Sequence, residues 1–545
     1  MWLCAWLAGS LALPALAAAE ESDAAATGVT GTGEVRIPPY RSSPSPPLAP
    51  VTIAPAAAAP VTTSSGGSGP GVTLAPSPTP QYERDEDAPL AGFTNNLPFI
   101  RSRDSNFVLF PSGRLNVDGF FFLNRGEPRA GVTPDGSNDD RPRQTIFLRR
   151  ARAEIMGTVL KHFDYMLAGE FAMAPTGSQS ASATDVFVNI NYTTWANIQI
   201  GQFDAPFTLE NRTVDRFIDF MERSITVRSF GIPQNKDAGI MLAGMAPSHF
   251  VRYELGVFNG DGLDVRNPDN HFDFMGRAYF APLALLSRAA TTRWLSEIWI
   301  GGSIWYGKRV DVSYQTPVLT TQGGVTLLPS TFGGGQQLVP NGDLLKWAVE
   351  LNVPIGPIGW RFELVHTDRE NLGLYRPASA MESMQGLNRV LLGSLNRNGT
   401  AFYAQMWYWI LGSPAILPTP GQEIPLRWAG YRKGKEAWPI GLYISARYER
   451  LILHQDDTMS PTALPDEQKV AVGSMSVDSF GVAINAWFTR HMRFSVNYLL
   501  NYLDGDLKLD DGSVRLPMPN NLGQPTLTYY RTAEHELLFR AAIGL

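Results

Sequence analysis

From residue 107 onward, apolar and polar residues alternate along the chain with a period of two. In residues 479–488 one face carries Phe480, Val482 and Ile484, and the other carries Ser479 and Asn485. The following segment repeats the pattern. Alternation over about ten residues is typical of a half-buried β-strand, and a tilted strand of that length crosses a lipid bilayer. The pattern therefore predicts an antiparallel sheet of membrane-crossing strands.

Sixteen segments of this kind can be placed along the chain. They are residues 114–123, 146–157, 163–171, 185–192, 197–202, 238–245, 250–258, 273–280, 297–306, 344–353, 360–367, 401–410, 442–451, 477–488, 492–503 and 534–544. After residue 19, no stretch reaches the roughly eighteen apolar residues that suggest a membrane-spanning helix. The predicted fold class is therefore all-β, a transmembrane antiparallel β-barrel of about 16 strands.

The connections between these segments alternate between short and long. Short ones include 158–162, 193–196, 354–359 and 489–491, and long ones include 124–145, 203–237, 307–343 and 504–533. Short turns at one end and long loops at the other are typical of an outer-membrane barrel, with both chain ends on the periplasmic side. Two connections on the short side, 281–296 and 411–441, are longer than this pattern predicts. A soluble sandwich is the alternative, but it would leave a large apolar surface in water.

Two segments precede the predicted barrel, which we assign to residues 93–545. Residues 1–19 are apolar and end at Ala17, Ala18 and Ala19, the pattern of a secretory signal peptide. Residues 20–92 are rich in Pro, Ala and Ser and nearly lack aromatic side chains, so we expect a disordered linker. The one cysteine, Cys4, lies in the signal peptide. We therefore expect an exported chain without disulfides, in the outer membrane of a bacterial cell.

Composition and charge exclude other classes of protein. Of the 545 residues, 18% are charged and 11% are aromatic, and the formal net charge is −6. So few charges and so many aromatic side chains fit neither a disordered chain nor a nucleic-acid-binding protein. We expect outer-membrane lipid as a partner and no nucleic acid.

Seven short segments occur in a characteristic order. They are FLRRAR at 147–152, GQFDAPF at 201–207, FMERS at 220–224, DAG at 237–239, GVFNG at 256–260, WPIGL at 438–442 and ARYERL at 446–451. The ordered set, which extends over most of residues 114–545, resembles the phosphate-selective porin O and P family. The resemblance implies a sixteen-stranded barrel, usually a homotrimer, whose third outer loop folds inward and constricts the pore.

The resemblance also implies that arginines guide anions to a lysine-rich site. In this sequence the loop that would fold inward is 203–237, and only eight of the 45 basic residues are lysines. Lys433 and Lys435 are the candidates for a lysine contribution. The cationic lining is therefore expected to be mainly arginine.

Arginines of the second strand and of residues 203–237 supply the candidate pore lining. In the second strand, Leu148, Arg150, Arg152 and Glu154 share one face, so two arginines are predicted to project into the lumen. The complete set of candidate anion-binding residues is Arg114, Arg150, Arg152, Arg212, Arg216, Arg223 and Arg228. Guanidinium groups stay charged and present forks of donors that fit phosphate oxygens. The alternative is that these arginines pair with Glu210, Asp215, Asp219 and Glu222 and brace the loop against the wall.

The predicted function is passive diffusion of small anions through an outer-membrane porin, with phosphate or oligophosphate favoured by the resemblance. A general diffusion porin for small polar solutes is the alternative. Less favoured are a barrel enzyme and a structural outer-membrane anchor, and no Gly-x-Ser-x-Gly motif is present. The seven histidines are scattered without metal-ligand spacing, so neither a metal site nor a cofactor is predicted.

Overall fold

The computed structural model describes residues 90–94, 97–123, 144–172, 181–246, 250–286, 295, 297–310, 319–324, 326–328, 337–412, 441–459, 473–489, 491–505 and 529–544. The predicted signal peptide, most of the predicted linker, Lys433 and Lys435 lie outside these residues.

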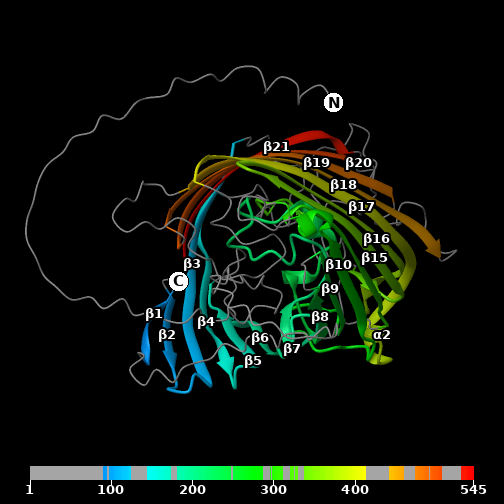
Figure 1. Ribbon diagram of the computed structural model, residues 1–545. Helices are drawn as coiled ribbons and strands as arrows, with labels where there is room; N and C mark the ends of the chain where they lie inside the picture. The colour runs from blue at the N-terminus through cyan, green and yellow to red at the C-terminus, as the bar shows by residue number, and fades with distance from the viewer. Residues whose placement is uncertain are drawn as a thin grey trace, which may run out of the picture. The chain divides into compact units, whose positions relative to one another are not determined.

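Sixteen strands close into an antiparallel barrel (Figure 1). They are β3 (Phe107–Phe122), β4 (Thr145–Val159), β5 (Phe163–Glu170), β6 (Ser182–Ile190), β7 (Asn197–Asp204), β8 (Lys236–Met245), β9 (Val251–Phe258), β10 (Asp273–Phe280), β11 (Trp299–Lys308), β15 (Asp343–Ile355), β16 (Ile358–Pro377), β17 (Arg389–Leu411), β18 (Gly441–Met459), β19 (Gly473–Thr489), β20 (Met492–Gly505) and β21 (Tyr529–Gly544). Each pairs with the next, and β21 pairs with β3, where Leu538 lies opposite Phe120. The prediction of a sixteen-stranded antiparallel barrel is confirmed, and each predicted segment overlaps one of these strands.

Five further strands were not predicted. β1 (Ala91–Thr94) and β2 (Leu97–Arg101) form a hairpin that pairs with the start of β3, where Ile100 lies opposite Leu109. β12 (Leu319–Thr320) and β13 (Thr326–Leu328) form a separate two-stranded sheet. β14 (Gln337–Pro340) pairs with the far end of β16. All five are two to five residues long, too short for a period of two to identify them in the sequence.

The helical elements are short. They are α1 (Ile225–Phe230), α2 (Ala380–Met384) and the 3₁₀ turns Pro233–Asn235 and Pro282–Leu286. In the described part of the chain, no helix has the length and apolar character needed to cross a membrane.

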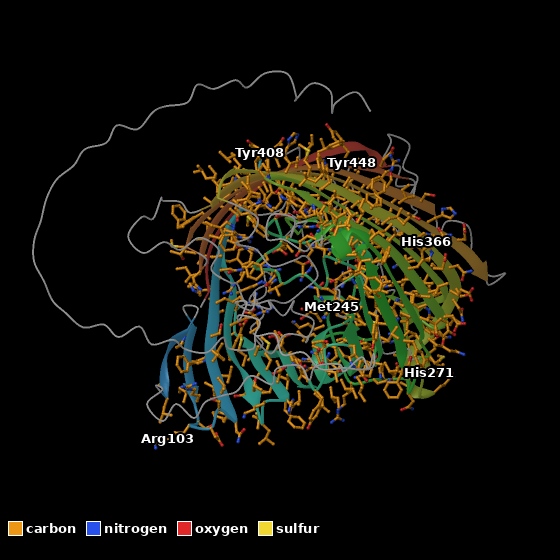
Figure 2. The ribbon with its side chains drawn as sticks, in the orientation of Figure 1. Arg103, Met245, His271, His366, Tyr408 and Tyr448 are labelled. Carbon is orange, nitrogen blue, oxygen red and sulfur yellow. The ribbon has the colours of Figure 1, made fainter. Side chains whose placement is uncertain are left out.

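The predicted alternation of faces is confirmed along the wall. On β19, Phe480, Val482 and Ile484 are exposed, whereas Ala483 and Asn485, at the alternate positions, are fully buried. Figure 2 shows side chains covering the outside of the wall, with Tyr408 and Tyr448 among them. Apolar side chains outside and polar side chains inside are the arrangement expected for a barrel in lipid with a polar lumen.

Strand length and connection length both vary around the barrel. β5 to β11 contain eight to ten residues each, and β16 to β18 contain 19 to 23. At one end most turns are tight: only residues 356 and 357 separate β15 from β16, and Gly356 has a φ of 59° that suits glycine. Two connections at the same end, 281–298 and 412–440, are long, as the sequence indicated. At the other end lie the other long connections, as predicted. The longer strands extend into segments that the sequence assigned to loops, including Arg369 within β16.

Candidate functional site

The connection between β7 and β8, residues 205–235, crosses the inside of the barrel; we call it the inward loop. It leaves the wall at β7, yet Phe220 and Met221 pack against Phe120 of β3 and Leu538 of β21. Phe217 stacks on Trp487 of β19 with ring centroids 6.3 Å apart. Most of its side chains are buried. The third long connection in chain order therefore lies against the opposite wall, in the lumen.

Each of the four acidic side chains of the inward loop contacts an arginine of the wall. The ion pairs are Glu210 with Arg447 (3.0 Å), Asp215 with Arg150 (2.6 Å) and with Arg114, Asp219 with Arg361 (2.8 Å), and Glu222 with Arg149 (2.9 Å) and Arg540 (3.0 Å). These arginines come from β3, β4, β16, β18 and β21, so the loop is tied to the wall in several directions. The predicted acidic neighbours are therefore the groups that hold the loop in place.

Charge pairing lowers the pKa of two of the loop carboxylates, Asp215 and Glu222. Burial alone would raise the pKa of Asp215, but the charges of Arg114 and Arg150 hold it well below its usual range. Burial likewise opposes ionisation of Glu222, and the charges of Arg149 and Arg540 outweigh it and lower the pKa. Because buried ions are costly unless paired, each contact favours one position of the loop.

Backbone and ring contacts add to the bracing. Arg447 of β18 lies over the ring of Phe220, 4.0 Å from its centroid. The guanidinium of Arg493 on β20 donates to the carbonyl of Ile218 at 2.8 Å, and Asn485 donates to that of Asp219 at 2.7 Å. The loop backbone therefore finds hydrogen-bond partners on the wall, as buried backbone requires.

A β-bulge in β4 changes which side chains face the lumen. Asn116 of β3 lies opposite Arg150 and Val117 lies opposite Leu148, so Arg149 is an extra residue on β4. Leu148 is consequently 38% exposed on the outer face, and its predicted place on the lumen face is wrong. Arg149 and Arg150 both reach the inward loop. A strict period of two does not anticipate this reversal.

The other predicted arginines are placed separately. Arg152 pairs with Glu170 at 2.8 Å, and Arg114 also pairs with Glu154 at 3.0 Å. Three arginines of the inward loop have other partners. Arg212 pairs with Glu254 at 3.2 Å, and Arg223 donates to the carbonyls of Glu210 (3.0 Å) and Thr213 (2.9 Å). Arg228 donates to the Thr320 hydroxyl (2.6 Å) and the Gln322 carbonyl (3.1 Å). The structure therefore brings Arg114 and Arg150 together on Asp215 and distributes the rest around the lumen.

A first pocket, the turn-side pocket, lies near the end of the barrel that carries the short turns. Its lining includes Arg114, Arg216, Arg493 and His491, with Trp487 beside them. Burial and the nearby charge of Arg114 lower the pKa of Arg216 to about 10, which leaves it protonated at neutral pH. This pocket therefore presents cations to the lumen.

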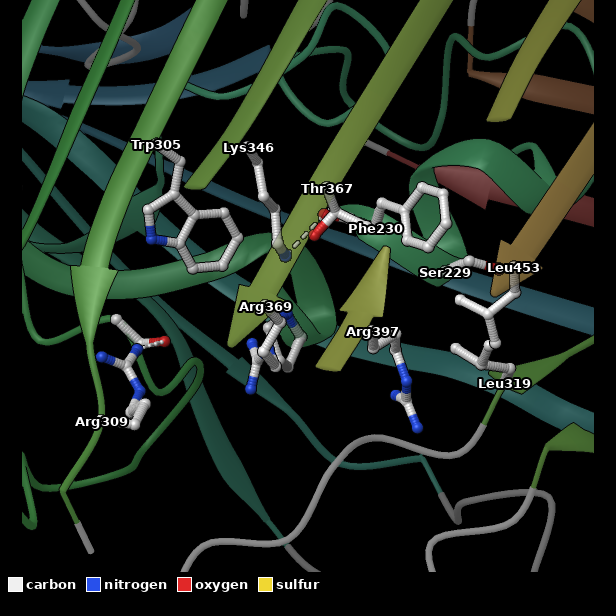
Figure 3. A pocket seen from close by; sticks show the side chains of 13 residues that line it. Ser229, Phe230, Trp305, Arg309, Leu319, Lys346, Thr367, Arg369, Arg397 and Leu453 are labelled. Atoms are coloured by element: carbon white, nitrogen blue, oxygen red, sulfur yellow. Dashed lines mark hydrogen bonds between the residues drawn. The ribbon is translucent and has the colours of Figure 1, made fainter. Parts of the chain in front are cut away.

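A second pocket, the loop-side pocket, lies on the side of the long connections (Figure 3). Its basic lining residues are Arg309, Lys346, Arg369 and Arg397. Arg369 lies two residues after the predicted strand 360–367, but β16 extends beyond that segment, so Arg369 is on the wall and lines this pocket. Sequence reasoning did not single out Lys346 or Arg397. A signal was available for Lys346, which alternates with the exposed residues Leu345 and Trp347.

The described residues offer no built metal site. Among them, no group of three or more His, Cys, Asp and Glu side chains is arranged to hold a metal ion. The chemistry available in the lumen is that of fixed charges and hydrogen-bond donors.

Comparison with solved structures finds outer-membrane proteins at low sequence identity. A loop-deletion mutant of OmpT, an outer membrane protein of Vibrio cholerae, is 11% identical with a TM-score of 0.43, covering 81% of this chain and 100% of that one. The outer membrane channel DcaP of Acinetobacter baumannii is 9% identical with a TM-score of 0.43, covering 82% and 99%. An anion-selective porin from Comamonas acidovorans is 7% identical with a TM-score of 0.40, covering 81% and 100%.

Comparison by sequence gives a family. No curated protein matches the chain. The family model for phosphate-selective porin O and P matches residues 125–505, which include most of the barrel and the whole inward loop. A porin family and a barrel with charged side chains in its lumen indicate an outer-membrane channel rather than an enzyme. The chain belongs to the phosphate-selective porin O and P family.

Proposed function

We propose that this porin is an anion-preferring diffusion channel in which the inward loop narrows the lumen. The observation that carries the proposal is the cationic lining on both sides of the loop. Arg114, Arg216 and Arg493 line the turn-side pocket, and Lys346 and Arg397 are among the cations of the loop-side pocket. Fixed cations raise the local concentration of anions and lower that of cations.

The acids of the loop do not cancel this lining, because wall arginines hold them. Glu210, Asp215, Asp219 and Glu222 all point toward guanidinium groups and are less than one tenth exposed. The negative charge of the loop carboxylates is therefore largely offset by the guanidinium groups beside them. Among the predicted residues, we assign Arg114, Arg150 and Arg216 to the anion path, with Arg152 and Arg228 as flanking charges. We assign Arg212 and Arg223 to bracing, since both are buried in contacts.

Phosphate or oligophosphate is the solute that the family description suggests. Planar guanidinium forks match phosphate oxygens, and arginines from different strands are close enough to share an acid at Asp215. A general diffusion porin for small polar solutes is the competing function. It is favoured by the extensive pairing of the arginines, which reduces the field that each one exerts on a solute.

Reversal-potential measurement distinguishes these two functions. The purified full chain is inserted into a planar bilayer under a potassium chloride gradient, and phosphate is then added to one side. We expect stepwise conductance without a cofactor. The reversal potential should shift from zero toward the equilibrium potential of chloride, and the chloride current should fall when phosphate is added. A preference for potassium would overturn the anion proposal. Chloride preference without any phosphate effect would leave the general porin.

Three further features are proposed from the family and the sequence. The chain assembles as a homotrimer, and both chain ends lie on the periplasmic side, where the tight turns would lie. Residues 1–19 act as the signal peptide, and residues 20–92 form a linker in front of the barrel. Chemical crosslinking in cells and protease access from the periplasm test the assembly and the orientation.

A further inference from the structure

The loop-side pocket is lined by two chemically different kinds of side chain. Figure 3 shows Lys346, Arg369 and Arg397 pointing into it, with Trp305 and Phe230 flanking Lys346. Leu319 and Leu453 also line the pocket, and all four of these apolar residues are less than 5% exposed. Among the described residues that line the pocket, four are basic and none is acidic. The pocket therefore combines basic side chains with an apolar end formed by Leu319 and Leu453, while Trp305 and Phe230 lie beside Lys346.

Several polar groups of the pocket have donor capacity left for a ligand. The Nη2 atom of Arg397 and the hydroxyl of Ser229 are buried, and neither has a hydrogen-bond partner in the described part of the chain. Arg397 as a whole is 92% buried and is held through Nε, which donates to Gln455 at 2.5 Å. Because a buried donor without a partner is costly, these atoms favour an acceptor in the pocket.

Lys346 brings a further donor group to the same place. Its ammonium group donates to the carbonyl of Phe230 at 2.8 Å and lies 3.8 Å from the ring centroid of Trp305. Lys346 and Arg397 are both within reach of the charge of Arg369. Arg309, by contrast, is already held by Asp273 at 2.7 Å and Asp261 at 3.2 Å. Like charges held close together are stabilised by an anion between them.

The size of the pocket limits the ligand. Its volume is about 50 Å³. A water molecule needs about 10–15 Å³ on this measure, so the pocket has room for roughly three to five waters and takes only a small ligand. Inorganic phosphate and short carboxylates are both small ligands of this kind.

The apolar side chains of the pocket favour a short carboxylate over inorganic phosphate. A phosphate ion has oxygens in all four directions, so at least one would face the apolar side chains without a hydrogen bond, at a cost of about 1–3 kcal/mol or more for a charged group. A short-chain carboxylate has its oxygens at one end and a hydrocarbon tail at the other. We propose that the loop-side pocket is a binding site for short-chain carboxylates, with the carboxylate near Lys346 and Arg397 and the tail against Leu319 and Leu453. This inference rests on the proposed anion channel and adds a class of solute to it.

Blocking of chloride current tests the inference. Single channels of the full chain in a planar bilayer at neutral pH are titrated separately with butyrate, formate and phosphate. Butyrate and formate carry the same charge and differ only in the tail. We expect butyrate to half-block the chloride current at a concentration about tenfold lower than formate, from the burial of two or three methylene-sized groups. We expect phosphate to block more weakly in this pocket than butyrate.

Variants separate the basic and the apolar lining of the pocket. Lys346→Met and Arg397→Gln should each raise the half-blocking concentrations of butyrate and formate alike. Leu319→Asn should remove most of the difference between butyrate and formate, and Leu319 lies in a two-residue strand that is not part of the barrel wall. The exposed Arg266→Gln is the control and should change neither value. If Lys346→Met fails to insert, Arg397→Gln supplies the same measurement.

Each outcome has a distinct meaning. Equal blocking by butyrate and formate, or tighter blocking by phosphate than by butyrate, would overturn the carboxylate site while leaving the anion channel intact. Unchanged blocking in Lys346→Met and Arg397→Gln would also overturn it. A wild-type channel without anion preference before any carboxylate is added would instead overturn the proposed function.

Discussion

The guanidinium of Arg150 on β4 lies 2.6 Å from the carboxylate of Asp215 in the inward loop. The two side chains are 13% and 6% exposed, and Arg114 of β3 contacts the same carboxylate. Removing one partner of a buried ion pair typically costs about 3–5 kcal/mol, because the other charge is left in a poor environment. The same arginines that were predicted to meet an anion therefore also hold the loop.

Glu222→Gln is expected to loosen the inward loop without weakening the barrel. The carboxylate of Glu222 receives Arg149 at 2.9 Å and Arg540 at 3.0 Å, and the neutral amide keeps only part of this attraction. Open-channel current noise should rise, whereas the unfolding temperature of the barrel should change little because the strand ladder is intact. Single-channel recording and heat-modified gel mobility measure the two effects.

Glu382→Gln is the matched control for this variant. Glu382 lies in α2 and pairs with Arg376 at 2.7 Å, but both side chains are at least one quarter exposed and far along the chain from the inward loop. Exposed pairs contribute about 0–1 kcal/mol. Equal noise in the two variants would contradict the bracing role of Glu222.

The loop should stay braced as the pH falls from 7 to 5. The pKa values of Asp215 and Glu222 lie below their usual values of 3.8 and 4.5, because nearby arginines outweigh the effect of burial. A carboxyl with a lowered pKa in the folded state contributes fully above its unfolded pKa, and this contribution is lost only as the pH falls through the folded value. Open-channel current noise, which reports the motion of the loop, should therefore be constant between pH 7 and 5. A transition within that window would mean that the two acids are not paired as described.

The barrel was predictable because apolar and polar residues alternate locally along each strand. Phe480, Val482 and Ile484 on β19 face outward in the structure as their spacing predicts, since lipid outside and water inside impose opposite polarity on neighbouring residues. The strand ends were less predictable. Arg369 lies in β16 although its surroundings contain loop-forming residues, because strands that extend beyond the bilayer no longer need an apolar face.

The site was predictable only in part. The loop arginines and acids were identified, but three of the partners of the acids lie on β16, β18 and β21, more than a hundred residues away in sequence. Arg149 faces the loop through a bulge, a local irregularity that depends on the register with β3. The loop-side pocket combines Lys346 and Arg397 through the closure of the barrel, which periodicity alone does not specify.

Protease should remove the predicted linker and leave the barrel. Residues 20–92 have too few apolar side chains to form a core, so limited digestion of the mature protein should leave a resistant fragment that begins near residue 93. Mass spectrometry of that fragment gives its start. A protected fragment that begins near residue 20 would show instead that the segment is docked, and would favour a partner-binding role.

Gly201→Ala should destabilise the wall where the chain enters the inward loop. Gly201 of β7 has a φ of 135°, and a Cβ there would lie 2.2 Å from the carbonyl oxygen of Val186 on β6. Gly386→Ala is the matched control, since Gly386 has a φ of 84° but open space around its Cβ position. Both variants lose the freedom of glycine, about 1–2 kcal/mol, and only Gly201→Ala adds a clash. Its yield of folded barrel should be clearly lower on refolding into detergent, and equal yields would contradict the close approach.

The double variant Arg150→Gln/Arg152→Gln should reduce anion preference. It removes two positive charges from the lumen face of β4 and leaves Asp215 and Glu170 with fewer partners, so the potential along the path becomes more negative.

The effect depends on ionic strength. Fixed charges act over about one Debye length, roughly 8 Å at physiological salt and about 30 Å at 0.01 M. We therefore expect the chloride to potassium permeability ratio to fall by roughly twofold to fivefold at low salt and by less at high salt. Arg103→Gln/Arg266→Gln removes the same charge from exposed positions and should leave the ratio nearly unchanged. If the two double variants shift the reversal potential equally, the selectivity comes from the overall charge of the protein, and Arg150 and Arg152 serve only to brace the loop and the wall.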